Sequence, residues 1–234
     1  MTKYYVPTDG TDSWRKLLAE PNKQWKTGHS AKSLAYCWEE AEGFPKSVLS
    51  VFNKSEYELF HSIEFLLGIP EHQVPLPGGK TESQNDIYVL AKSNDELISI
   101  AVEGKVSEAF GDLVSKWGKE MTSGKEKRLN YLLDKLGLSG LDVNHIRYQL
   151  LHRTASALIE ADRFCANHAL MLVHSFSQEH MWFDDYVAFA KLFNIDAKLN
   201  IIHHAGNRNG KELYLGWVRE NQSISKGSQK GGRL

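Results

Sequence analysis

The sequence predicts an α/β fold in which helices flank a mixed β-sheet. The segments DIYVLAK and ELISIAVEGKV are rich in β-branched residues and are separated by SND, as expected of a β-hairpin. The continuous apolar run HALMLVHSF is typical of a strand covered on both faces. Segments with apolar residues at three- and four-residue spacing lie between and before these strands, and this spacing predicts helices.

The first fifty residues predict helices in WRKLLAE and SAKSLAYCWEEA. Ser30 is the expected N-cap of the second helix, and Pro45 helps to end it. A further helix is predicted from about Ser55 to Leu67, because Ser55 and Glu58 have the spacing of a capping box. We expect residues 1–50 to form a helical extension packed on an α/β core at 51–220.

Later segments predict four helices and two strands beyond the central ones. Residues 74–85 contain two prolines and two glycines, which favours a loop within one domain. Helices are predicted around 109–120, in KEKRLNYLLDKLGL ending at Gly137, at 143–166, and from a Ser177 cap to about residue 193. KLNIIHH and KELYLGWV predict strands joined by the loop AGNRNG, and residues 221–234 are expected to be a disordered tail.

Composition limits the class of protein. Hydrophobic residues make up 41% and charged residues 24% of the 234 residues, as in soluble globular proteins. No apolar run approaches the roughly 18 residues of a membrane helix, and the start MTKYYVPTDG lacks a secretion signal's apolar core, so we expect a cytoplasmic protein without a membrane partner.

The net charge of −1 excludes a strongly basic coating protein but leaves room for a local nucleic-acid-binding patch. The two cysteines, Cys37 and Cys165, are too isolated to suggest a disulfide framework or a cysteine zinc site.

The predicted hairpin brings charged side chains together. If Asn94 and Asp95 form its two-residue turn, Asp86 lies directly across from Glu103, and the strand period places Lys105 on the same face. Two neighbouring carboxylates repel each other, and a divalent cation relieves this repulsion. Mg²⁺ prefers such oxygen ligands, and the arrangement suits phosphodiester hydrolysis with Lys105 orienting or deprotonating the attacking water.

A second interpretation of this hairpin is a solvated strand face carrying a cross-strand ion pair. A register slip of one residue would send Asp86 to the opposite face of the sheet. Ala101, Val102 and Val106 flank the charges, however, and buried charges need a partner or a metal ion. The spacing of these residues alone does not decide between a metal site and a solvated strand face.

The run Asp86, a strand hairpin and then Glu103-Gly104-Lys105 resembles the PD-(D/E)XK nuclease signature. The segments SQNDIYVLA, AVEGKVSEAFG, RYQLLHRTASALIEA and VHSFS further resemble an uncharacterised bacterial family within that superfamily. The resemblance implies a restriction-endonuclease-like fold, metal binding by Asp86, Glu103 and the Gly104 carbonyl, and a catalytic role for Lys105. One departure is Asn85, which stands where a proline is common.

Three more residues are site candidates through this resemblance. Glu64 lies on the apolar stripe of the predicted 55–67 helix, and it either reaches solvent or completes the metal site as a first-helix glutamate. Gln149 and Arg153 belong to a polar stripe with Ser156 and Glu160. Such a stripe is usually a solvated face, but the resemblance makes Gln149 and Arg153 candidate contacts to phosphate or water.

Taken together, these features predict a Mg²⁺-dependent nuclease, with Mn²⁺ as a substitute, that hydrolyses phosphodiester bonds of DNA. The alternative is a catalytically inactive nuclease-like module that binds or regulates. A homodimer is compatible with either function. The histidines are interpreted as structural or surface groups. His203 and His204 are adjacent on a strand, so they point to opposite faces and cannot easily share an ion. His174 precedes Ser175, but no glycine-flanked nucleophile elbow supports a catalytic pair there.

Overall fold

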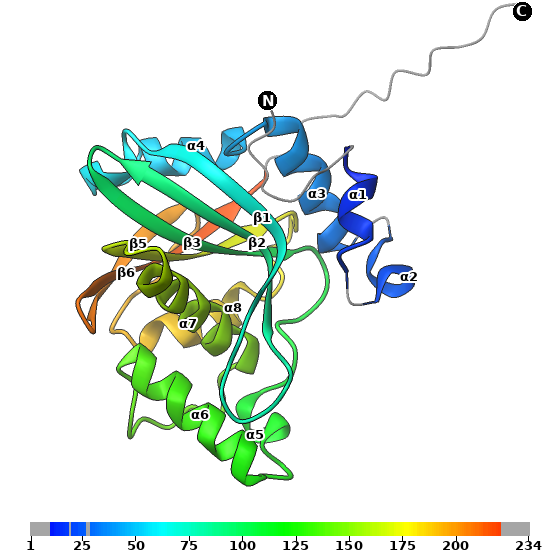
Figure 1. Cartoon of the computed structure of the whole chain (residues 1–234), viewed down its shortest axis with the longest axis vertical. Helices are drawn as coiled ribbons and strands as arrows, with labels where there is room; N and C mark the ends of the chain where they lie inside the picture. The colour runs from blue at the N-terminus through cyan, green and yellow to red at the C-terminus, as the bar shows by residue number, and fades with distance from the viewer. Residues whose placement is uncertain (1–9, 19, 27–28, 221–234) are drawn as a thin grey trace, which may run out of the picture.

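The protein is described by a computed structural model covering residues 10–18, 20–26 and 29–220. Six strands form one mixed sheet with helices on both sides, which confirms the predicted α/β fold class (Figure 1). The strands are β1 Glu64–Val74, β2 Ser83–Ser93, β3 Glu96–Lys105, β4 His168–Ser175, β5 Ile201–Arg208 and β6 Lys211–Arg219. The helices are α1 Asp12–Arg15, α2 Pro21–Gln24, α3 Ser30–Ala41, α4 Lys46–Asn53, the 3₁₀ turn η1 Glu58–Phe60, α5 Val114–Trp117, α6 Ser123–Leu136, α7 Tyr148–Arg163 and α8 Phe183–Lys191.

The strand order is β1-β2-β3-β4-β6-β5. Strands β1, β2 and β3 form an antiparallel meander, whereas β4 pairs in parallel with both β3 and β6. Parallel pairing requires a long crossover, and α5, α6 and α7 supply it between β3 and β4. Strand β4 is buried along nearly its whole length, as its continuous apolar run predicts.

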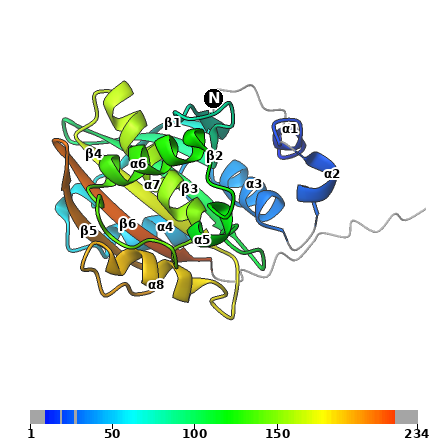
Figure 2. The ribbon, with the colours of Figure 1, turned by 90° about the horizontal axis from the view of Figure 1, so that it is seen from below.

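Each face of the sheet is covered by its own hydrophobic core. Helices α6, α7 and α8 pack on one face, and α3 and α4 pack on the other with Trp14 from α1 (Figure 1). Figure 2 views the molecule from the side of α5–α8 and shows these helices in front of the sheet. Trp38 of α3 is fully buried in the second core, and α4 spans the boundary predicted at residue 50. The N-terminal helices thus share a core with the strands.

The predicted helix at 55–67 is wrong. The Ser55 side chain accepts a hydrogen bond from the backbone N–H of Tyr57 at 3.2 Å, and the chain makes only the short turn η1 before β1 begins at Glu64. Pairing with β2 along almost the whole of β1 outweighs the local helical pattern. A register shift between Phe65 and Leu67 breaks the two-residue alternation that would mark a strand in the sequence.

Other element boundaries differ from the predictions. Ser30 is the first residue of α3 rather than its side-chain cap, and its backbone N–H donates to Glu108 Oε1 at 2.7 Å. Helix α7 begins at Tyr148, five residues later than predicted, and α8 begins at Phe183. Ser177 does not cap α8; its Oγ accepts from the Met181 N–H in the preceding loop. In the AGNRNG segment β5 continues through Arg208 to a tight turn.

The predicted disordered tail at 221–234 lies outside the described residues. Within the described part of the chain, no helix has the length and apolar character needed to cross a membrane.

Candidate active site

The β2–β3 hairpin has the predicted register. Ser93 pairs with Glu96 around the Asn94–Asp95 turn, and Ile87 pairs with Val102 at the other end. Asn94 has a φ of 53°, the left-handed conformation that two-residue hairpin turns require. One residue beyond the last pair, Asp86 lies across from Glu103, and Asp86 Oδ2 accepts a hydrogen bond from the Gly104 N–H at 2.7 Å. The prediction that Asp86 and Glu103 meet is therefore confirmed.

Strand β1 adds a third carboxylate, Glu71, that the sequence reasoning missed. Pro70 pairs with Ile87 and His72 pairs with Asn85, so Glu71 lies opposite Asp86. Glu71, Asp86 and Glu103 consequently form one row across three neighbouring strands, called the acid row below. Glu71 has a left-handed φ of 52°, and its Oε2 accepts from Gln84 Nε2 at 2.8 Å. A strand prediction at 64–74 would have been the signal for Glu71.

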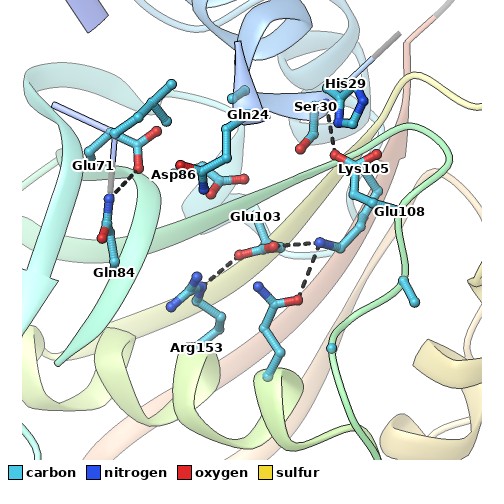
Figure 3. A pocket seen from close by; sticks show the side chains of 15 residues that line it. Gln24, His29, Ser30, Glu71, Gln84, Asp86, Glu103, Lys105, Glu108 and Arg153 are labelled. Carbon is cyan, nitrogen blue, oxygen red and sulfur yellow. Dashed lines mark hydrogen bonds and ion pairs between the residues drawn. The ribbon is translucent and has the colours of Figure 1, made fainter. Parts of the chain in front are cut away.

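Glu103 is the most strongly paired member of the acid row. Lys105 Nζ lies 2.6 Å from its Oε1 and Arg153 Nε lies 2.6 Å from its Oε2, and all three residues are buried (Figure 3). Burial alone would raise the pKa of Glu103, but Lys105 and Arg153 outweigh it and lower this pKa. Glu103 is thus ionised and held in a fixed orientation.

Asp86 and Glu71 have the opposite electrostatic environment. Burial, followed by repulsion from Glu103, raises the pKa of Asp86 to about 7. Burial, followed by repulsion from Asp86, raises the pKa of Glu71 well above its usual value. Without a further cation, Asp86 is therefore about half protonated at pH 7, and Glu71 holds its proton more tightly than an ordinary glutamate does.

A cavity of about 490 Å³ opens beside the acid row. Strands β1–β3 form one wall, α7 contributes Gln149 and Arg153, and the segment from α2 to the start of α3 contributes Gln24 and Ser30 (Figure 3). Lys105 Nζ donates to Gln149 Oε1 at 3.2 Å, so this lysine is shared between Glu103 and α7. The volume is sufficient for a hydrated cation together with a phosphate group.

The donor set fits a divalent cation that prefers oxygen ligands. The Lys105 carbonyl accepts from the Phe176 N–H at 2.7 Å on the β4 side, and carbonyls alternate in direction along a strand, so the Gly104 carbonyl faces the Asp86 side. The side chains of Asp86 and Glu71 line the cavity, and the Gly104 carbonyl lies on the Asp86 side of β3. Hard cations such as Mg²⁺ bind through one or two carboxylates, supplemented by water and substrate oxygens.

The prediction that Glu64 completes the site is wrong. Glu64 is exposed at the beginning of β1 and lies across from Lys92, near the turn end of the meander. The acid row lies at the other end of the same strand. The error follows from the helix prediction, which placed an exposed strand residue on an apolar stripe.

Helix α7 brings both predicted polar candidates, Gln149 and Arg153, to the cavity. Arg153, Ser156 and Glu160 are buried against the sheet, so the interpretation of this stripe as a solvated face is wrong for these three residues. Ser156 Oγ donates to Ser83 Oγ at 2.8 Å, which fastens α7 to the start of β2. A contact of Gln149 or Arg153 with substrate stays a prediction.

A separate cluster of Cys37, His174 and Glu220 has side-chain atoms close enough to suggest a metal centre. Trp38 Nε1 donates to His174 Nδ1 at 3.0 Å, so the Nε2 of neutral His174 carries the proton, and Nε2 lies 3.0 Å from Glu220 Oε2. A metal-binding histidine normally has the reverse arrangement, with its second nitrogen donating a hydrogen bond. The cluster is better described as a partly buried hydrogen-bond network that joins α3 to β4.

Comparison with known proteins gives one match. A family model described as a domain of unknown function (DUF6946) matches residues 7–222. No curated protein and no solved structure matches the chain.

Proposed function

The chain belongs to the DUF6946 family, whose description states no activity, and we propose from the site itself that the protein is a metal-dependent nuclease acting on DNA. The observation that carries the proposal is the acid row, which lines one cavity together with Lys105, while the Gly104 carbonyl faces the Asp86 side of β3. This arrangement agrees with the similarity of Asp86 and Glu103-Gly104-Lys105 to the PD-(D/E)XK signature. The proposal therefore has support from geometry and from motif.

Each residue has a role that follows from its surroundings. Asp86, Glu71 and the Gly104 carbonyl would hold Mg²⁺ or Mn²⁺, and Glu103 would contribute an oxygen while it positions Lys105. The bound ion would acidify a water and neutralise charge that develops on the phosphate. Lys105 donates to Glu103 and Gln149, and in this proposal it would orient that water and stabilise negative charge by its ammonium group.

One observation favours a second candidate, a nuclease-like module that binds without cutting. Both carboxylate oxygens of Glu103 are engaged by Lys105 and Arg153, and the three side chains are almost completely buried. A closed ion-pair network of this kind can serve structure alone. Under this alternative, Lys105 forms an ion pair with Glu103 and takes no part in a reaction.

Cleavage assays separate the two functions. Wild-type protein is incubated with single- and double-stranded DNA and RNA in the presence of Mg²⁺ or Mn²⁺, alongside Asp86→Asn and Lys105→Met. We expect cleavage by the wild type and a loss of about 10²-fold or more in both variants. Glu64→Gln is the matched control, since this exposed carboxylate lies far from the acid row. Full cleavage by Lys105→Met would refute the mechanism. Metal binding that depends on Asp86 without any cleavage would favour the binding module.

A further inference from the structure

We propose that a second pocket, between the β1–β2 loop and helices α6 and α7, binds a phosphate group of the nucleic-acid strand next to the one at the acid row. The pocket has a volume of about 270 Å³ and is lined by Gly79, Glu82, Lys125, Arg128, Tyr148 and His152, among others. The existence of an anion site here stands on the pocket alone. Its assignment to a nucleic-acid strand rests on the proposed function.

Arg128 is a buried cation that has no counter-ion within the described part of the chain. The residue is only 8% exposed, and its guanidinium donates from Nε to the Pro77 carbonyl at 2.9 Å and from Nη2 to the Leu76 carbonyl at 3.4 Å. Among the described residues, no carboxylate forms an ion pair with it. Burial of an unpaired charge is costly, and an anion in the pocket would compensate it.

Lys125 adds a second cation to the same pocket. Its Nζ donates to the carbonyls of Trp117 at 2.9 Å and of Glu120 at 3.2 Å, and no carboxylate in the described part of the chain pairs with it. The lining holds one carboxylate, that of the exposed Glu82. Burial, followed by the positive charges of Arg153 and Arg128, lowers the pKa of His152 well below its usual value, so this side chain is neutral at pH 7. The net charge of the lining is therefore positive.

The pocket walls are closely packed and favour recognition by charge. A Cβ on Gly79 would lie 3.2 Å from Arg128 Nη2, so the absence of a side chain leaves space for the guanidinium. The Trp117 and Tyr148 rings stack with centroids 4.0 Å apart, and His152 lies on Tyr148 at 5.0 Å. Because these rings stack on one another, we expect the pocket to bind phosphate rather than to stack a base.

The second pocket and the cavity of the acid row lie on two sides of the same turn of α7. Tyr148 and His152 of α7 line the pocket, whereas their chain neighbours Gln149 and Arg153 line the cavity of the acid row. Ser83 Oγ joins the two sides, because it lies 2.8 Å from His152 Nδ1 and 3.1 Å from Arg153 Nη1. A polyanionic strand that crosses α7 at this turn would reach both sites.

Binding measurements in the Asp86→Asn background with EDTA test the proposal without cleavage. A labelled oligonucleotide is titrated by fluorescence anisotropy at several NaCl concentrations. Removing one phosphate contact with Lys125→Gln should make the negative slope of log affinity against log salt less steep by about 0.9, with weaker binding at low salt. Arg128→Met should act similarly, and Glu82→Gln should strengthen binding. Lys46→Gln is the control for charge loss, because Lys46 is exposed at the start of α4 on the opposite face of the sheet.

A parallel arm uses pyrophosphate and measures thermal stabilisation of the same proteins. Equal affinity and slope for wild type, Lys125→Gln and Arg128→Met would overturn the assignment to a nucleic-acid strand. If Lys125→Gln and Arg128→Met lose the stabilisation by pyrophosphate but bind the oligonucleotide as before, the pocket binds free phosphate compounds. This result would also overturn the assignment to a nucleic-acid strand. If no oligonucleotide binds but pyrophosphate stabilises in a Lys125-dependent way, the proposed nuclease function fails while the anion site survives. Lys125→Gln is the primary test, since its partly exposed side chain leaves the core intact.

Discussion

Glu71 and Glu64 are two carboxylates on β1 with opposite surroundings. Glu71 faces Asp86 in the acid row, whereas Glu64 is exposed near the turn end of the meander. We predict that Glu71→Gln weakens Mg²⁺ or Mn²⁺ binding by at least about tenfold, because removing even a group that only orients the ligands of a metal ion typically costs 10- to 100-fold. Calorimetric titration measures the dissociation constant. An equal effect of Glu64→Gln would contradict the assignment of Glu71.

The raised pKa of Asp86 predicts how stability changes with pH. A carboxyl group whose pKa is raised to about 7 by folding binds its proton more tightly in the folded state. Without metal, the free energy of unfolding should fall as pH rises from about 4 to about 7, by at most about 4 kcal/mol. Urea unfolding across this range measures the loss, and Asp86→Asn should reduce it. A wild-type stability that rises steadily over this range would contradict the prediction.

The same protons compete with a metal ion. At pH 8 the carboxyl groups of the acid row are more fully ionised, so Mg²⁺ or Mn²⁺ should raise the melting temperature there. At pH 5.5 the rise should be much smaller, because Asp86 and Glu71 retain protons. Thermal unfolding at both pH values, with EDTA as reference, provides the measurement. An equal rise at both values would indicate that the ion binds elsewhere.

At the scale of elements, α7 is held to the sheet by charge. Arg153 pairs with Glu103 inside the protein, and removing one partner of a buried pair typically costs 3–5 kcal/mol. We predict that Arg153→Met lowers the free energy of unfolding by about 3 kcal/mol, the lower end, because Lys105 still compensates Glu103. The double variant Arg153→Met, Glu103→Gln should lose less than the sum of the single losses in urea unfolding. Additive losses would show that the two side chains are not coupled.

The elements also show what the sequence could predict. Helix α6 ends where Gly137 adopts a left-handed φ of 66°, as the glycine signal predicts, and the Asn94–Asp95 turn fixes the β2–β3 register locally. Strand β1 has no comparable local signal, because its conformation depends on pairing with β2 across the loop at 75–82. The same dependence concealed Glu71. Asp86, Glu103 and Lys105 were predictable because a single short turn determines their meeting.

At the scale of the whole molecule, the N-terminal helices complete the core on one face of the sheet. Trp38 is fully buried there, and its Nε1 donates to His174 of β4. We predict that Trp38→Ala lowers the free energy of unfolding by at least about 3 kcal/mol, since it leaves both a cavity and an unpaired histidine nitrogen. Urea unfolding measures this loss. The exposed Tyr36 of the same helix is the control, and a similar loss from Tyr36→Ala would contradict the prediction.

The α/β class was predictable from the alternation of helical and strand patterns, but the strand order was not. Strand β4 lies between β3 and β6, and its parallel partners are separated from it by helices that span many residues. No short turn specifies such pairs, so hydrophobic patterns identify the strands without ordering them. The cavity of the acid row depends on this order and on α7, which explains why its full lining could not be read from the motif.

The two-residue turn at Asn94–Asp95 also limits how the gene can change. One residue gained or lost there would shift β2 against β3 and send Asp86 and Glu103 to opposite faces of the sheet. The connection between β4 and α8 carries no such constraint on the meander. Among members of the family that keep the site, insertions and deletions should therefore gather in that connection and be excluded from the hairpin.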